Sequence, residues 1–399
     1  MSTARRSHLP RVPLGRPILV GLVVVRILVV GIGFARIATA PVTDEYVLRF
    51  HEIAVSEGRP YLDVPVEYPP GELLAIEALG RGLPGSTAGW LLVLNLGADL
   101  ATAAMVSRAW GRKAGVWYLL LGTPILWFSY LGFDLLSVAL AVGGIVLARR
   151  GDERAGGVVL ALAVWTRLWP AVLIPALWIG DRRRAVRWTL GVSAAVLAAW
   201  VSYAGVQGPR QVLTFRGASG WEFESLIGAV WWVIVGSARG VSEAGASRFG
   251  VAPLWAKGIL AGLAVAGVAL AWRKARGEPQ AIGKPALAAV AILLCCSPLL
   301  SYPFVVWLLP WAAIAGEEGP EGSRMRHIAM TVVLLTAVSV ASFGSKESLP
   351  WLTQGSLVAR NLLLLLLAGV WLTKPGLRRD PEDVRASRRW QARSARASR

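Results

Sequence analysis

Long apolar runs separated by short, Arg-rich connections extend along nearly the whole chain. A membrane-spanning helix needs about 20 largely apolar residues, and most of these runs come close to that length. The pattern predicts an all-α, polytopic membrane protein with about ten spanning helices. The expected spans are 17–40, 88–107, 114–131, 188–204, 252–271, 285–301, 328–343 and 356–373, with shorter spans at 135–148 and 302–315.

Three further apolar segments, 71–83, 156–179 and 223–238, are short or interrupted. The second contains Arg167 and Pro170, which favours two half-helices joined by a turn that is buried in protein. We therefore expect all three segments to insert only partly. If 71–83 crossed the membrane instead, several Arg-rich connections would change sides.

Composition supports a membrane protein over several soluble domains. Hydrophobic residues make up 55% of the 399 residues, and the mean hydropathy is +0.54. The net charge of +18 comes mostly from Arg in short connections and in the two tails, which is typical of the positive-inside rule and not of nucleic-acid binding. Six Arg-rich clusters fall on one side if the ten runs span, which predicts cytoplasmic N and C termini.

These patterns predict one integral membrane domain over residues 1–376. Its first extracytoplasmic loop is expected at 41–87. The Arg- and Ser-rich segment 377–399 is expected to be a disordered cytoplasmic tail that contacts anionic membrane lipids. No nucleic-acid partner is expected.

The sequence excludes several common kinds of site. Cys295 and Cys296 are adjacent in an apolar run, which argues against a disulfide framework. No His and Cys cluster has zinc-site spacing, and no Gly-rich phosphate loop is present. We therefore predict no resident cofactor and no structural metal.

The first polar loop concentrates charge and aromatic residues. Within 43–70 there are eight acidic or basic side chains, His51 and three tyrosines. Residues 43–57 have helical periodicity with one apolar face, which predicts an interfacial helix capped by Thr43 and ended by Gly58. Asp44 and Glu45 then fall in its first turn, where acids also stabilise the helix dipole. The apolar face is Tyr46, Val47, Phe50, Ile53 and Ala54.

A proline-rich strap follows this helix. Pro60, Pro65, Pro69 and Pro70 hold the segment "GRPYLDVPVEYPP" extended. Asp44 and His51 lie seven residues apart on one side of the helix, near Arg49 and Arg59. An acid, a His and cations together favour a site where a base meets an anionic leaving group, although a single interfacial His is more often a hydrogen-bonded surface group.

These residues carry a resemblance to a known family. Asp44, Tyr46 and then "EGRPYLDVPVEYPP" resemble the first-loop signature of GT-C superfamily glycosyltransferases, most like the actinobacterial family 87 polyprenyl-phosphate-mannose-dependent mannosyltransferases. Weaker similarity extends over 132–150, 155–178, 216–229 and 299–311. Relatives usually have Lys at the position of Arg167, and Gln and Tyr at the positions of Pro303 and Phe304.

The resemblance implies a GT-C-like fold in a bacterial plasma membrane. It also implies transfer, with inversion, of a sugar from a polyprenyl-phosphate donor to a hydroxyl of an extracytoplasmic glycolipid or glycan. Mannose is the expected sugar. The match places the catalytic base on Asp44, with Glu45 as its substitute. A divalent cation on the lipid phosphate is left open.

Several side chains are expected to contact substrate. Arg167 is a charge within an apolar segment, so it should face a wet cavity or tie helix ends together. The candidates for the phosphate are Arg59, Arg210, Arg216 and Lys346, because Arg donates paired hydrogen bonds to phosphate. The candidates for the sugar are Asp134, Glu222 and Glu224, with Trp221 beside the last two. Further substrate-binding candidates in the first loop are His51, Tyr61, Glu67 and Tyr68.

Two other classes compete with an enzyme. A transporter or flippase of lipid-linked sugar should show an internal repeat and ionisable residues at mid-membrane in paired broken helices. The sequence predicts a single broken segment, and its acids crowd an outer loop. A noncatalytic scaffold for cell-envelope assembly fits the apolar pattern but gives no role to a carboxylate beside a proline strap.

Overall fold

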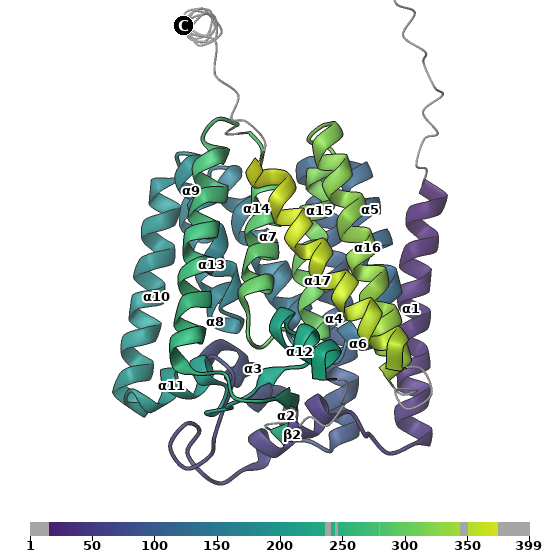
Figure 1. Cartoon of the computed structure of the whole chain (residues 1–399), viewed down its shortest axis with the longest axis vertical. Helices are drawn as coiled ribbons and strands as arrows, with labels where there is room; N and C mark the ends of the chain where they lie inside the picture. The colour runs from purple at the N-terminus through teal and green to yellow at the C-terminus, as the bar shows by residue number, and fades with distance from the viewer. Residues whose placement is uncertain (1–15, 236–240, 244–245, 279, 344–349, 374–399) are drawn as a thin grey trace, which may run out of the picture.

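The chain folds into a bundle of helices with a layer of short elements at one end (Figure 1). The structure, a computed structural model, describes residues 16–235, 241–243, 246–278, 280–343 and 350–373. The predicted cytoplasmic tail and the candidate Lys346 lie outside these residues. The expected all-α, polytopic membrane fold is confirmed.

Six helices in the described part of the chain are long and apolar enough to cross a membrane. Each coincides with one of the ten expected runs, because an uninterrupted apolar run favours a helix that satisfies its own backbone hydrogen bonds in lipid. They are α1 (Arg16–Thr39), α4 (Pro84–Trp110), α10 (Arg183–Ala204), α13 (Leu254–Ala275), α16 (Pro320–Phe343) and α17 (Pro350–Thr373).

The other four expected runs form shorter or broken helices. Proline explains most of the interruptions, since it lacks a backbone N–H and clashes with the preceding turn. Their short length is tolerated because protein surrounds them: α14 and α15 are almost fully buried. These runs form α5 (Arg112–Gly122), η1 (Thr123–Ile125), α6 (Leu126–Ser129), α7 (Asp134–Arg149), α14 (Gly283–Cys296), η3 (Tyr302–Leu308) and α15 (Leu309–Ala315).

Two hairpins turn inside the protein. The first comprises α8 (Glu153–Thr166), η2 (Trp169–Leu173) and α9 (Ile174–Ile179), and it breaks at Arg167, as the sequence indicated. The second joins α14 to η3 through residues 297–301. The sequence pattern predicted two consecutive spans here, 285–301 and 302–315, so the structure contains a pair of broken hairpins where only one was expected.

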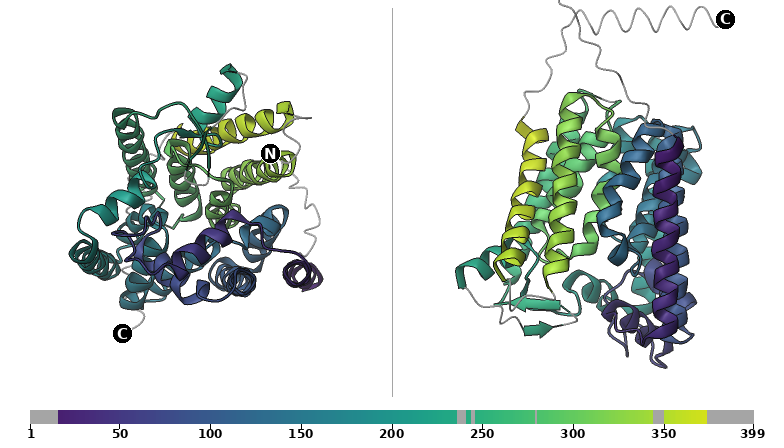
Figure 2. Two further views of the ribbon diagram at one scale, coloured as in Figure 1. Left: turned by 90° about the horizontal axis from the view of Figure 1, so that it is seen from below. Right: turned by 90° about the vertical axis from the view of Figure 1, so that its right-hand side faces the viewer.

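The outer layer is the set of short elements at one end of the bundle, opposite the start of α1 and the end of α17 (Figures 1 and 2). It contains a small antiparallel sheet of order β1-β3-β2, in which Trp221 pairs with Phe249 and Val241 pairs with Arg248. The layer consists of α2 (Glu45–Val55), α3 (Pro70–Gly80), α11 (Gln207–Thr214), α12 (Leu226–Val235), β1 (Trp221–Glu222), β2 (Val241–Glu243) and β3 (Ala246–Phe249).

Helix α2 is amphipathic as predicted, but its apolar face meets protein. Val47, Phe50 and Ile53 are buried, and the helix packs against α3 and α4. Its N-cap is Asp44 rather than Thr43, and the helix stops at Val55 before Gly58 is reached. The helix therefore fixes the start of the first loop onto the bundle.

The Arg-rich connections α4–α5, α7–α8, α9–α10, α13–α14 and α15–α16 all lie at the end of the bundle where α1 begins and α17 ends (Figure 1). The outer layer thus lies at one end of the bundle, and the cationic connections lie at the opposite end. This is the arrangement that the positive-inside rule predicts for a protein whose cationic end is cytoplasmic.

Candidate active site

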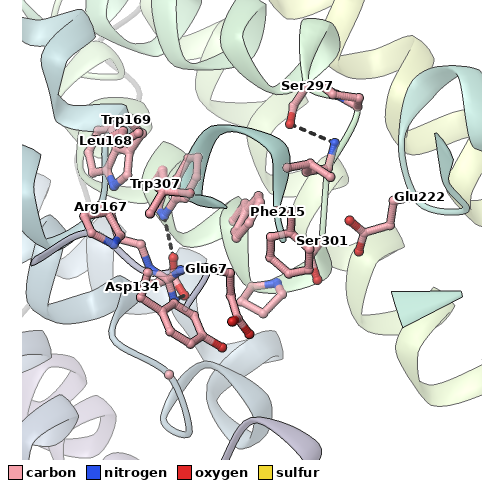
Figure 3. A pocket seen from close by; sticks show the side chains of 18 of the residues that line it. Glu67, Asp134, Arg167, Leu168, Trp169, Phe215, Glu222, Ser297, Ser301 and Trp307 are labelled. Carbon is pink, nitrogen blue, oxygen red and sulfur yellow. Dashed lines mark hydrogen bonds and ion pairs between the residues drawn. The ribbon is translucent and has the colours of Figure 1, made fainter. Parts of the chain in front are cut away.

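A cavity of about 1060 Å³ lies where the outer layer meets the two broken hairpins. Its walls come from α2, residues 67–69, the start of α7, η2, α11, β1, α13 and the α14–η3 turn. The wall formed by η2, α13 and α14 is apolar or small, with Val172, Ala261, Ala264 and Leu293. The end under the outer layer is polar. Figure 3 shows Arg167, Asp134 and Trp307 on one side of this cavity and Glu222 on the opposite side.

Arg167 sits at the break of the first hairpin and joins three elements. Its Nη2 atom lies 3.0 Å from Glu72 Oε1 and 3.4 Å from Asp134 Oδ2. Glu72 reaches Arg167 because Gly71 packs against the end of α8, where a Cβ would lie 2.6 Å from the Trp165 carbonyl oxygen. Both acids are buried and contact the same nitrogen, so Arg167 Nη2 is already paired where it faces the cavity.

Aromatic side chains hold this corner of the cavity. Trp307 donates a hydrogen bond from Nε1 to Asp134 Oδ1 at 2.9 Å (Figure 3). Its ring stacks between those of Trp169 and Phe304, with centroid distances of 5.4 and 4.4 Å. Phe304 therefore contributes stacking in place of the polar contact expected of the Tyr in relatives.

Glu67 organises a second group of charges. Its buried carboxylate lies 3.2 Å from Arg49 Nη2 and 3.2 Å from Arg216 Nε. Arg216 is aimed by a turn in which Phe215, Arg216 and Gly217 have φ values of 50°, 60° and 83°. Non-glycine residues in the left-handed region are costly and cluster at functional sites. Arg49 also pairs with Glu52 at 2.8 Å, whereas Glu67 is the one acidic partner of Arg216 among the ion pairs of the described residues.

Glu222 faces the cavity from β1, across from Asp134 (Figure 3). Burial, and then the neighbouring carboxylate of Glu224, raise the pKa of Glu222 to about 8. Glu224 is held by Arg360, with 3.0 Å between Oε2 and Nη1. The carboxyl group of Glu222 thus faces the cavity and holds its proton at neutral pH, so it can donate as well as accept a hydrogen bond.

Asp44 and Glu45 occupy different positions at the start of α2. Asp44 Oδ1 accepts hydrogen bonds from the backbone N–H groups of Tyr46 and Val47, each at 3.1 Å. Burial raises the pKa of Asp44, and those two hydrogen bonds oppose the rise. Asp44 is not part of the cavity wall described above, whereas Glu45 is exposed and lines it.

The cavity gathers seven of the fifteen residues that the sequence singled out as catalytic or substrate-binding candidates. Three of the others, His51, Arg59 and Tyr61, make contacts away from it. His51 Nδ1 lies 3.0 Å from the Gly80 carbonyl oxygen, and Arg59 is exposed and pairs with Asp63 at 2.8 Å. Tyr61 is buried and donates to the Tyr68 carbonyl oxygen at 2.7 Å. The seven that line the cavity are Glu45, Glu67, Tyr68, Asp134, Arg167, Arg216 and Glu222.

Trp221 is buried in the sheet, paired with Phe249, and it is not among the lining residues of the cavity. Arg210 is likewise absent from them. Asp44 and His51 have no mutual contact among the hydrogen bonds of the described residues; His51 instead fixes α2 to the end of α3. The expected acid and His pair is therefore not assembled.

Lys257 is a cavity residue that sequence reasoning missed. It lies near the start of α13, its Nζ donates to the Ala218 carbonyl oxygen at 2.9 Å, and it shares the cavity-facing side of the helix with Ala261 and Ala264. The sequence offered one signal for it: a single Lys near the start of an otherwise apolar span, with small residues one and two turns later. Within the described residues, no group of three or more His, Cys, Asp or Glu is placed to hold a metal ion.

No curated protein matches the chain. Two crystal structures of ArnT from Cupriavidus metallidurans are similar to it, one in the apo state at 14% identity and one bound to undecaprenyl phosphate at 15% identity. Each comparison covers 89% of this chain and 76% of the ArnT chain, with a TM-score of 0.45.

The family comparison is more specific. Residues 67–301 match the model of glycosyltransferase family 87. This range begins at Glu67 and therefore includes the cavity residues from the strap, α7, η2 and β1, but not Asp44 or Glu45. It covers more than half of the chain, which therefore belongs to glycosyltransferase family 87.

Proposed function

We propose that this membrane glycosyltransferase moves a hexose, with mannose as the first candidate, from a polyprenyl-phosphate donor to a hydroxyl of an extracytoplasmic glycolipid or glycan. One observation carries the proposal: a single cavity combines an apolar wall with a polar end under the outer layer that holds Arg49, Arg216 and Lys257. A polyprenyl-phosphate sugar has a matching sequence of groups: a long apolar chain, an anionic phosphate and a polar sugar.

The cationic side chains of the cavity suit the phosphate group of the donor. Arg49, Arg216 and Lys257 lie on the polar side; Glu67 pairs with both arginines, and Glu52, which also lines the cavity, pairs with Arg49 at 2.8 Å. Arg donates paired hydrogen bonds to phosphate, and a low-dielectric wall strengthens such contacts. Arg167 is less suited, because Glu72 and Asp134 already pair with it.

The apolar wall suits the lipid tail. Ala261 and Ala264 on α13 and Val172 on η2 leave room beside the phosphate-binding end. Helix α13 is exposed to the surroundings along its other faces, as at Ile259, Leu263 and Val265. A polyprenyl chain can therefore pass from the bilayer along α13 into the cavity.

The chemistry requires a base next to the acceptor hydroxyl. The acceptor oxygen forms a bond to the anomeric carbon, the bond from that carbon to the phosphate oxygen breaks, and polyprenyl phosphate leaves with the electron pair. A carboxylate takes the hydroxyl proton. Asp44 is the base expected from the family resemblance, and its raised pKa favours proton uptake; Glu45, which lines the cavity, is the alternative.

The proposed orientation places the outer layer on the extracytoplasmic side of a bacterial plasma membrane, with both termini cytoplasmic. Its support is the position of the Arg-rich connections at the opposite end of the bundle (Figure 1). Anionic lipids of the inner leaflet would then contact those connections.

A transporter of lipid-linked sugar is the second candidate. The pair of broken hairpins that meet at the cavity favours it, since such pairs mark the binding sites of many transporters. Against it, the acids of the site cluster under the outer layer rather than along a path through the bundle.

The test compares membranes containing the wild type, Asp44→Asn, Glu45→Gln and Asp63→Asn. Each is incubated with radiolabelled polyprenyl-phosphate-mannose and a mixed glycolipid extract. Asp63 is the control, because it is a first-loop carboxylate paired with Arg59 outside the cavity. Transfer should be lost in the variant that lacks the base, with expression unchanged, and kept in Asp63→Asn.

Two outcomes would contradict parts of the proposal. Undiminished transfer by both Asp44→Asn and Glu45→Gln would remove these residues as the base. No transfer by the wild type from any polyprenyl-phosphate sugar would remove the donor class. Movement of the intact labelled donor across vesicles, without transfer, would establish the transport hypothesis.

A further inference from the structure

A second, smaller cavity of about 400 Å³ lies beside the first and has walls of a different kind. It extends under the outer layer toward α16 and α17, which contribute no residue to the first cavity. The proposed function assigns it no role. Its described lining residues are Glu45, Tyr46, Glu222, Phe223, Glu224, Ser247, Ser301, Tyr302, Ser339, Val340, Phe343, Thr353 and Leu357.

The two cavities share a wall formed by Glu45, Tyr46, Glu222 and Ser301. Two of these residues are joined: the Tyr46 and Ser301 hydroxyl oxygens lie 3.0 Å apart. Tyr46 also meets Tyr302 edge to face, with 6.4 Å between ring centroids. Ligands in the two cavities would therefore meet at the same four side chains, which include one of the two candidate bases.

The two cavities differ in their cationic side chains. The first has four, Arg49, Arg167, Arg216 and Lys257, beside five carboxyl groups. Among its described lining residues the second has no Lys or Arg and carries three carboxyl groups, those of Glu45, Glu222 and Glu224. Of these, Glu224 is neutralised by Arg360 behind it. A phosphate would be disfavoured in the second cavity, because Glu45 would repel it and no described lining residue is cationic.

Hydroxyl-bearing ligands suit the second cavity. Ser247, Ser301, Ser339 and Thr353 offer hydroxyls that can donate or accept, and carboxylates accept hydrogen bonds from ligand hydroxyls. Phe223 and Phe343 stack with 5.1 Å between centroids and supply an apolar surface beside these polar groups. The volume lies at the lower end of the about 300–1,000 Å³ typical of small-molecule sites.

We propose that the second cavity binds the saccharide end of the acceptor, and that Glu45, Tyr46, Glu222 and Ser301 form the junction where its hydroxyl meets the donor sugar. This assignment rests on the proposed function, since it takes the first cavity as the binding site of the donor. It implies that the acceptor end is an uncharged sugar rather than a phosphorylated one. It also makes α16 and α17 determinants of acceptor selectivity.

The test fills the second cavity from α16 without touching the shared wall. Val340→Phe adds a ring at a residue that lines only the second cavity. Val338→Phe is the matched control, because Val338 is 39% exposed on the outside of the same helix. Both variants and the wild type are reconstituted in nanodiscs.

The first measurement does not depend on catalysis. An alkyl mannoside that carries a photoreactive diazirine next to its sugar ring is cross-linked to each protein, and the labelled peptides are mapped by mass spectrometry. Labelling of α16 and α17 is expected in the wild type and in Val338→Phe, with a loss of about tenfold in Val340→Phe. Equal labelling in Val340→Phe, or labelling confined to α13 and η2, would overturn the assignment.

The second measurement is transfer from radiolabelled polyprenyl-phosphate-mannose to the glycolipid extract. Val340→Phe should raise the half-saturating acceptor concentration by about tenfold and leave that of the donor unchanged. A change in the donor value instead would overturn the assignment. Labelling of α16 and α17 without transfer by the wild type would contradict the proposed function while leaving a saccharide site in place.

Discussion

Replacing Glu222 with Gln tests how much ionisation of the carboxyl at the shared wall lowers the free energy of unfolding. In the folded protein, burial and the neighbouring Glu224 raise the pKa of Glu222 from its ordinary 4.5 to about 8. The residue is 7% exposed, and its carboxyl faces cavities on both sides. In the unfolded chain the same group titrates near its ordinary value.

The difference makes stability depend on pH in a defined window. Between about pH 4.5 and 8 the folded protein retains a proton that the unfolded chain has lost, so the free energy of unfolding falls as pH rises, and the fall is complete above pH 8. Each pH unit in this window corresponds to about 1.4 kcal/mol. The total is at most about 5 kcal/mol, because water that enters the cavities reduces the cost of ionisation. Gln cannot ionise and removes this dependence.

The assay is thermal unfolding of wild type, Glu222→Gln and Asp181→Asn in one detergent at pH values from about 5 to 9. The wild-type Tm should fall more steeply with pH than that of Glu222→Gln, with the largest gap at the alkaline end. Asp181→Asn is the control, because the Asp181 side chain is 86% exposed at the opposite end of the bundle; it should follow the wild type. Parallel curves for wild type and Glu222→Gln would refute the reasoning.

Three further predictions test individual contacts. Asp44→Ala should lower the free energy of unfolding by about 1 kcal/mol through loss of the α2 cap, whereas Asp44→Asn keeps the cap; equal Tm values for the two variants would contradict this. Arg360→Met should cost about 3–5 kcal/mol in denaturant unfolding, because it leaves Glu224 buried without its partner; an unchanged midpoint would count against it. Gly71→Ala should cost about 1–3 kcal/mol, because its Cβ would meet the Trp165 carbonyl oxygen at 2.6 Å; unchanged stability would show that the backbone moves aside freely.

The apolar pattern determined the long helices. Each of the six helices that could span a membrane coincides with an expected run. In lipid, a long apolar run is stable as a helix, because the helix satisfies all of its own backbone hydrogen bonds. The break at Arg167 was also visible, since a charge and a proline interrupt that run. The Arg-rich connections likewise indicated which helix ends share a side of the bundle.

The first loop shows where local pattern stops being sufficient. Its amphipathic helix was predicted, but the partners of its polar residues were not. Asp44 caps α2, His51 contacts Gly80, and Arg59 pairs with Asp63, so three candidates for chemistry make structural contacts. Contacts of this kind satisfy polar groups without any ligand, and sequence spacing does not distinguish them from a site.

Only the tertiary structure assembled the cavity. Asp134 and Trp307 are 173 residues apart and share a hydrogen bond, and Glu67 meets Arg216 from another element. The turn at 297–301 lines the cavity because η3 folds back against α14, and Lys257 faces it because of the rotation of α13. Apolar periodicity sets which residues form helices, since that depends on local backbone energetics and burial. Which polar residues meet depends on how the helices pack, and this is decided by contacts between distant parts of the chain.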